Sequence, residues 1–90
     1  MKISISYAPK FVRQYKKLPI KLQDEIKIKI DLFENKDNHK ILKVHKLNGP
    51  FKNFFSFSVD YSHRIIFEHV SKNEVAFLKV GDHDVYEKYE

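Results

Sequence analysis

The feature that most constrains the fold is a change in the spacing of apolar residues near the turn dipeptide Gly49-Pro50. Over residues 11–33, apolar residues recur every three or four positions, which is typical of amphipathic helices. After it, the pattern alternates from one residue to the next, which is typical of strands. Short polar segments at residues 60–62 and 71–73 divide this second half. The sequence therefore predicts three strands joined by tight turns, which makes them antiparallel hairpins.

The first half predicts one short strand followed by two helices. Residues 2–7 alternate between polar and apolar side chains, as a half-buried strand does. Pro9 suits the first turn of a helix, and Pro19 both ends that helix and opens the next one. Segment 20–34 fits both a helical and a strand period. We expect a helix, because its many polar residues are weak strand formers and because about 15 residues is long for a strand. The apolar stripes predicted for the two helices are Phe11, Tyr15 and Leu18, and Leu22, Ile26, Ile30 and Phe33.

Together these elements predict an α+β fold in a single domain spanning residues 1–90. We expect the two N-terminal helices to pack on a small, mainly antiparallel twisted sheet in the order β-α-α-β-β-β. The first strand is expected to return and pair with the later ones. We expect residues 39–50 to form a connection before the sheet.

Composition limits where such a chain works. It has no cysteine, which excludes disulfides, thiolate metal sites and cysteine nucleophiles and suits a reducing cytoplasm. The longest apolar run, residues 75–78, is far shorter than the ~20 residues of a membrane span. The N-terminus has no apolar segment typical of a signal peptide. We therefore expect a cytoplasmic protein with no membrane partner.

Charge is distributed unevenly around a net value of +5. Residues 1–81 carry a net charge of +8, whereas residues 82–90 carry −3. A basic body of this kind suggests a polyanionic partner, of which nucleic acid is the first candidate. A solvated lysine-rich surface explains the same charge equally well. Charge alone therefore does not favour a polyanionic partner over a solvated lysine-rich surface.

Five histidines are the most informative residues for chemistry. His63 and His69 share one face of a predicted strand, which favours a turn role for His63 and a half-buried structural role for His69. No pair of histidines has the spacing typical of a zinc site, so we expect no metal. His45 comes just before the predicted hairpins and His83 just after the last strand, at strand ends where functional side chains concentrate.

His45, His83 and Arg64 are together the three groups that RNA cleavage could use without a metal or cofactor. The reaction needs a base for the ribose 2′-OH, an acid for the leaving 5′-oxygen and a fixed positive charge for the phosphate. Histidine can do either proton transfer, and arginine stays charged. Each residue alone also has an ordinary explanation, as a solvated histidine or an arginine that pairs with a carboxylate. Spacing in sequence does not establish that the three converge.

The sequence resembles the RelE/ParE toxin superfamily of bacterial type II toxin–antitoxin systems, and points toward its YoeB and YafQ branches. The resemblance covers nearly the whole chain. It rests on the order of elements and on three segments, which are Leu47-Asn48-Gly49, Asp60-Tyr61-Ser62-His63-Arg64-Ile65-Ile66-Phe67 and Val80-Gly81-Asp82-His83-Asp84-Val85-Tyr86. The resemblance implies a small, metal-independent endoribonuclease that cleaves messenger RNA in the ribosomal A site. It also implies that a cognate antitoxin protein silences the enzyme.

The resemblance gives roles to individual residues. It implies that His45 is the general base, that Arg64 stabilises the transition state and that His83 is the general acid. Tyr86 falls near the aromatic residue that positions a base of the message. The candidate phosphate contacts are Lys46, Lys52 and Lys79.

The sequence also departs from its relatives. The RelE branch has lysines where this chain has Ser56 and Ser58. The YafQ branch has a histidine and an aspartate where this chain has Ser58 and Ser62. The site is therefore expected to contain fewer functional side chains than in either branch. We expect this to affect the rate of RNA cleavage more than its chemistry.

Two other functions remain open from the sequence. One is a ParE-like toxin of the same fold that binds DNA gyrase and cleaves nothing. Because such a protein needs no acid–base pair, His45 and His83 favour the ribonuclease. The other is a catalytically inactive binding domain, which a structural salt bridge to Arg64 would favour.

Overall fold

The computed structural model describes residues 2–48 and 53–82. Its elements are β1 (Ser4–Tyr7), α1 (Pro9–Lys16), α2 (Ile20–Phe33), the 3-10 helix η1 (Lys36–Asn38), β2 (His45–Lys46), β3 (Phe55–Ser58), β4 (Arg64–Ser71) and β5 (Glu74–Gly81). The predicted strand, two helices and three later strands are all present, but the predicted order β-α-α-β-β-β lacks one strand, because the segment expected to be a connection contains β2. The structure adds η1 and the short strand β2, which the sequence does not predict. A two-residue strand is too short to show a period.

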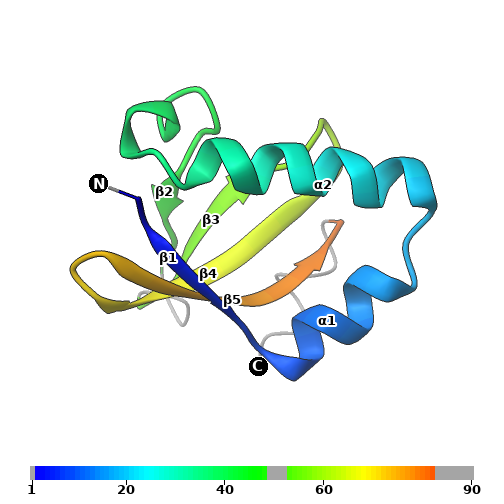
Figure 1. The fold of residues 1–90 in the computed structure, drawn as a ribbon, viewed down its shortest axis with the longest axis horizontal. Coiled ribbons are helices and arrows are strands. Elements are labelled where there is room, and N and C mark those ends of the chain that lie inside the picture. Colours follow the sequence, from blue (N-terminus) through cyan, green and yellow to red (C-terminus); the bar gives the residue numbers. More distant parts are fainter. Residues whose placement is uncertain (1, 49–52, 83–90) are drawn as a thin grey trace.

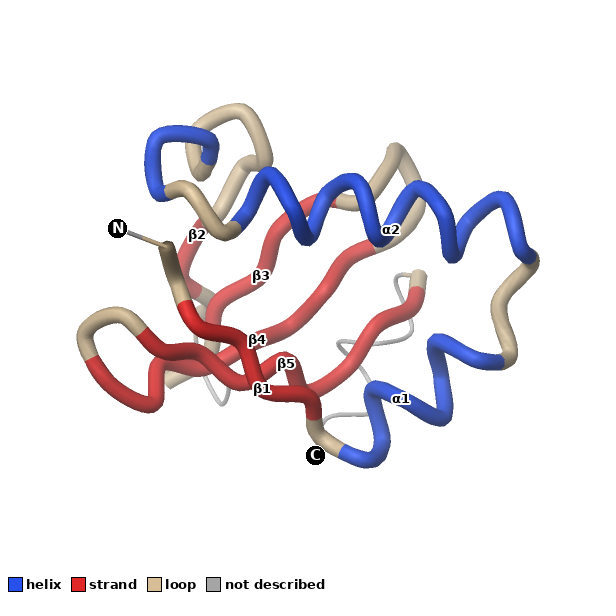
Figure 2. The backbone as a smooth tube through the Cα atoms, in the orientation of Figure 1, coloured by secondary structure: helices blue, strands red, loops and turns tan. Residues whose placement is uncertain are grey.

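The five strands form one sheet in the order β1-β5-β4-β3-β2. β1 runs parallel to β5, and the other neighbouring strands are antiparallel. The first strand therefore returns to pair with the last one, as predicted. Both helices lie over the same face of the sheet (Figures 1 and 2).

The helices begin where the prolines predict. α1 starts at Pro9, and α2 starts directly after Pro19. In α2, Ile26 and Phe33 are fully buried, whereas Ile28 is 54 % exposed. The segment that fitted both periods therefore folds as a helix, and its buried residues follow the helical spacing. No helix in residues 2–48 or 53–82 is long and apolar enough to cross a membrane.

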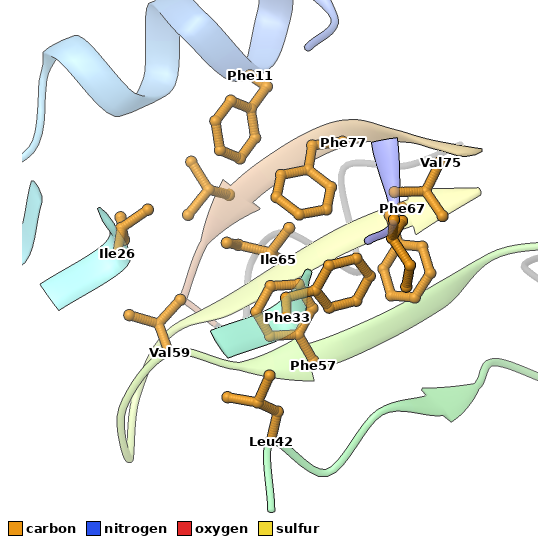
Figure 3. Packing of buried hydrophobic residues seen from close by; sticks show 12 residues of the cluster. Phe11, Ile26, Phe33, Leu42, Phe57, Val59, Ile65, Phe67, Val75 and Phe77 are labelled. Carbon is orange, nitrogen blue, oxygen red and sulfur yellow. The ribbon is translucent and has the colours of Figure 1, made fainter. Parts of the chain in front are cut away.

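An aromatic core fills the space between the helices and the sheet (Figure 3). Phe33 of α2 lies among three strand phenylalanines, and its ring centroid is 4.7 Å from Phe57, 5.0 Å from Phe67 and 5.3 Å from Phe77. All four rings are at most 1 % exposed. Full burial of each such side chain stabilises the fold by about 1.5–3 kcal/mol.

A β-bulge between β4 and β5 changes which face their residues occupy. Ile66 lies opposite Lys79, but Phe67 lies opposite Phe77, so one residue of β5 is skipped. A one-residue shift turns later side chains to the other face. Val80 and Phe77 both join the core for this reason, while Lys79 leaves it.

Two histidines contribute to the structure near the core. His39 Nε2 lies 2.8 Å from the carbonyl oxygen of Phe33, and the two rings stack at 4.4 Å. His69 is exposed, so its predicted half-burial is wrong, although its ring does make structural contacts. Its ring meets the edge of Phe55 at 4.8 Å near a second register shift, where the β4–β5 hairpin ends.

Candidate active site on the second face of the sheet

Strand register places His45 and Arg64 on the same face of the sheet. His45 lies opposite Ser56, and Arg64 lies opposite Ser58. Residues directly opposite one another share a face, as do residues two apart on a strand. All four therefore lie on the face away from the helices, which we call the second face. The strand spacings put the two Cα atoms about 12 Å apart.

The centre of the second face is enclosed. Ser56 and Ile66 are fully buried there, and Lys79, opposite Ile66, is only 4 % exposed. Very little of Lys79 is accessible to a phosphate group. The structure therefore does not favour the phosphate contact that the sequence suggests for Lys79.

His45 is exposed and has a defined hydrogen bond. Its Nδ1 lies 2.9 Å from the carbonyl oxygen of Lys43. Because a carbonyl oxygen can only accept, Nδ1 must carry the proton. In the neutral ring, Nε2 then has the free electron pair. This arrangement suits the role of general base that the resemblance implies.

Arg64 is half-buried and is held by the turn between β3 and β4. Its Nη1 donates to the carbonyl oxygens of Asp60 at 3.0 Å, His63 at 3.1 Å and Tyr61 at 3.5 Å. No ion pair within residues 2–48 and 53–82 joins Arg64 to a carboxylate. The salt bridge that would favour an inactive domain is therefore not seen in this part of the chain.

Asp60 closes the same turn from the other side. Its Oδ1 accepts from the backbone N–H groups of Ser62 and His63, both at 2.8 Å, and lies 2.9 Å from Nδ1 of His63. Burial alone would raise the pKa of Asp60, but the hydrogen bonds from the His63 side chain and the two backbone groups outweigh it and lower that pKa. The turn role predicted for His63 is confirmed.

A hollow of about 490 Å³ lies beside Arg64. It is lined by Lys43, Ser58, Asp60, Tyr61 and Arg64. Lys43 is not among the site residues that the sequence predicts, because its position depends on a positive φ that no sequence motif indicates.

The remaining predicted residues do not join this group in the described structure. Lys46 is exposed and lies opposite Phe55, so alternation directs it to the face that His45 does not occupy. His83, Tyr86 and Lys52 lie outside the described residues. In the described part of the chain, no three histidine or acidic side chains gather in a way that could hold a metal ion.

Solved structures of toxins and toxin–antitoxin complexes share this fold. A chain of the E. coli DinJ–YafQ toxin–antitoxin complex matches with a TM-score of 0.73 and 17 % identity, covering 100 % of both chains. The archaeal RelE–RelB complex from Pyrococcus horikoshii matches at 0.71 and 16 % identity, covering 91 % of this chain and 96 % of the other. The YoeB–YefM complex from Staphylococcus aureus matches at 0.69 and 20 % identity, covering 92 % and 99 %.

No protein-family model and no curated protein matches the sequence. The likeness therefore rests on three-dimensional structure, at an identity that establishes the fold alone. It confirms the architecture of two helices on one face of a small sheet that the sequence resemblance implied. The chain has the RelE-like fold seen in YafQ, RelE and YoeB toxin structures.

Proposed function

We propose that this chain is the toxin of a type II toxin–antitoxin system and a metal-independent endoribonuclease that cleaves messenger RNA in the ribosomal A site. We also propose that residues 1–90 form a single toxin domain. The observation that carries the proposal is that His45, with Nε2 available as a base, shares the second face of the sheet with Arg64. The fold shared with known toxins supports the functional class.

The proposed reaction is attack by the ribose 2′-OH on the neighbouring phosphate. Nε2 of His45 takes the 2′-OH proton, the 2′-oxygen forms a bond to phosphorus, and the bond from phosphorus to the 5′-oxygen breaks. Arg64 stabilises the charge that builds on the phosphate oxygens. His83 donates a proton to the leaving 5′-oxygen. The products are a 2′,3′-cyclic phosphate and a 5′-hydroxyl, and no metal or cofactor takes part.

The remaining roles follow from the resemblance. Tyr86 positions a base of the message, Lys52 contacts a phosphate at the site, and Lys46 makes at most a weak phosphate contact from the other face of the sheet. The partners are messenger RNA, the ribosome and a cognate antitoxin, and the protein acts in the cytoplasm. The neighbours that are toxin–antitoxin complexes support the antitoxin as a partner class.

Expression in bacteria tests the proposal. We expect the wild-type chain to arrest growth and cleave messenger RNA, and Arg64→Ala or His83→Ala to relieve both effects. Lys72→Ala is the matched control, because Lys72 is an exposed cation in the turn between β4 and β5. Unchanged toxicity in both active-site variants would contradict the assignment. Growth arrest through gyrase with intact messenger RNA would instead establish the ParE-like alternative.

A further inference from the structure

Lys43 has an unusual backbone conformation for its residue type. Its φ is 60°, and among the described residues it is the one non-glycine residue with a positive φ. Glycine adopts this left-handed region without steric cost, and asparagine tolerates it. A lysine here costs free energy, and no described ion pair of Lys43 offsets that cost.

The backbone around Lys43 is fixed by hydrogen bonds on both sides. The Lys43 N–H donates to the Lys40 carbonyl at 3.1 Å, and the Val44 N–H donates to the His39 carbonyl at 3.0 Å. The carbonyl of Lys43 is the group that holds Nδ1 of His45. Glycine at position 43 would provide the same carbonyl at less cost, so the lysine side chain needs a separate reason.

Lys43 lines the hollow beside Arg64. The other lining residues are Ser58 and Tyr61, which carry hydroxyls, and Asp60, which carries a carboxylate. Oδ1 of Asp60 is engaged by His63 and two backbone N–H groups. Among the described residues, the hollow is therefore lined by two cationic residues, two hydroxyl residues and one acidic residue whose Oδ1 already has partners, and cations with hydroxyls are the groups that bind a phosphate.

We propose that Lys43 binds a backbone phosphate of the RNA together with Arg64, next to the phosphate that is cleaved. This inference rests on the proposed function and adds a residue to it. The positive φ itself is the ordinary end of a helical turn, since the Lys43 and Val44 N–H groups make the two hydrogen bonds of the Schellman motif, and the phosphate contact explains why lysine and not glycine stands there. Lys43 then contributes twice, by its carbonyl to His45 and by its amine to the substrate.

The test separates the two contributions of Lys43. Lys43→Gly and Lys43→Asn keep a residue that accepts positive φ but remove the charge, and Lys43→Arg keeps the charge. Lys40→Ala is the control, since Lys40 is an exposed lysine of the same segment that does not line the hollow. The probe is a short single-stranded RNA with 2′-O-methyl groups, which cannot be cleaved. Binding is measured to the free RNA and to ribosomes that carry it, at several salt concentrations.

We expect Lys43→Gly and Lys43→Asn to weaken binding about three- to fivefold and to lower the salt slope by about 0.7, as for one lost phosphate contact. Lys43→Arg should bind as the wild type does. The melting temperature of Lys43→Gly should equal or exceed that of the wild type, because the strain is relieved.

Three results would overturn the inference. If the wild type binds RNA in either form while the glycine and asparagine variants bind equally well, Lys43 makes no phosphate contact and the proposed function stands. If both variants melt well below Lys40→Ala, the lysine is kept for packing. If the wild type binds neither the free RNA nor the loaded ribosome, the proposed function fails and this inference fails with it.

Discussion

The two faces of the sheet use the same strands for different purposes. On β3, Phe57 belongs to the buried aromatic core, while its neighbours Ser56 and Ser58 lie on the second face. The helix-covered face is apolar and continuous. The second face has a buried centre of Ser56, Ile66 and Lys79, with His45 and Arg64 at its margin. The comparison indicates that the helix-covered face determines the fold, and that the groups for chemistry lie around the buried centre of the second face.

The largest effect should follow a change in the core. Phe33→Ala removes the ring that contacts three strand phenylalanines, and we expect a loss of about 3–5 kcal/mol in the free energy of unfolding. Tyr61→Ala removes an aromatic ring that is 96 % exposed and should change that free energy by less than about 0.5 kcal/mol. Urea denaturation measures both. Equal losses would contradict the claim that the buried core, and not the residues beside the hollow, determines the stability of the fold.

A smaller effect is expected at the turn that holds Arg64. Asp60→Asn replaces the carboxylate that accepts from His63 and from two backbone N–H groups by a weaker, neutral acceptor, and we expect a loss of about 1 kcal/mol at neutral pH because this turn is partly exposed to solvent. Since folding lowers the pKa of Asp60, its stabilising contribution is present above about pH 4 and is lost as the pH falls through the lowered value. Denaturation at pH 7 and at pH 3 should therefore show a smaller difference for the variant than for the wild type. An equal or larger difference would contradict this role for Asp60.

The smallest effect concerns Lys46. Because its side chain lies on the face that His45 does not occupy, Lys46→Ala should weaken RNA binding less than about twofold, and less than Lys43→Gly does. Titration of the 2′-O-methyl RNA with Lys46→Ala and with Lys43→Gly measures which variant binds more weakly. A greater loss for Lys46→Ala would show that the phosphates follow the edge of the sheet instead of the hollow beside Arg64.

Much of the fold could be predicted from the sequence because its signals are local. Pro9 and Pro19 mark the starts of both helices, and the spacing of Ile26 and Phe33 agrees with the face that α2 buries. The position of Lys79 could not be predicted. Strict alternation along β5 groups it with Phe77, and only the pairing with β4 reveals the bulge that separates them.

The residues of the site could be predicted only where a sequence motif contains them. Arg64 and His45 could be selected from the resemblance, and the register places them on one face. Lys43 could not be selected, because its role depends on a positive φ that the identity of a lysine does not indicate. Its carbonyl bond to His45 is likewise a property of the folded chain.

The central claim is that the second face carries a metal-free ribonuclease site with His45 as its base. The direct measurement is cleavage of messenger RNA by purified wild-type protein and His45→Gln, with EDTA, on and off the ribosome, followed by analysis of the product ends. We expect wild-type products with 2′,3′-cyclic phosphate and 5′-hydroxyl ends, and a rate about 10²–10⁴-fold lower for His45→Gln with unchanged melting. An unchanged rate in His45→Gln, or wild-type cleavage that EDTA abolishes and that leaves 5′-phosphate ends, would contradict the account.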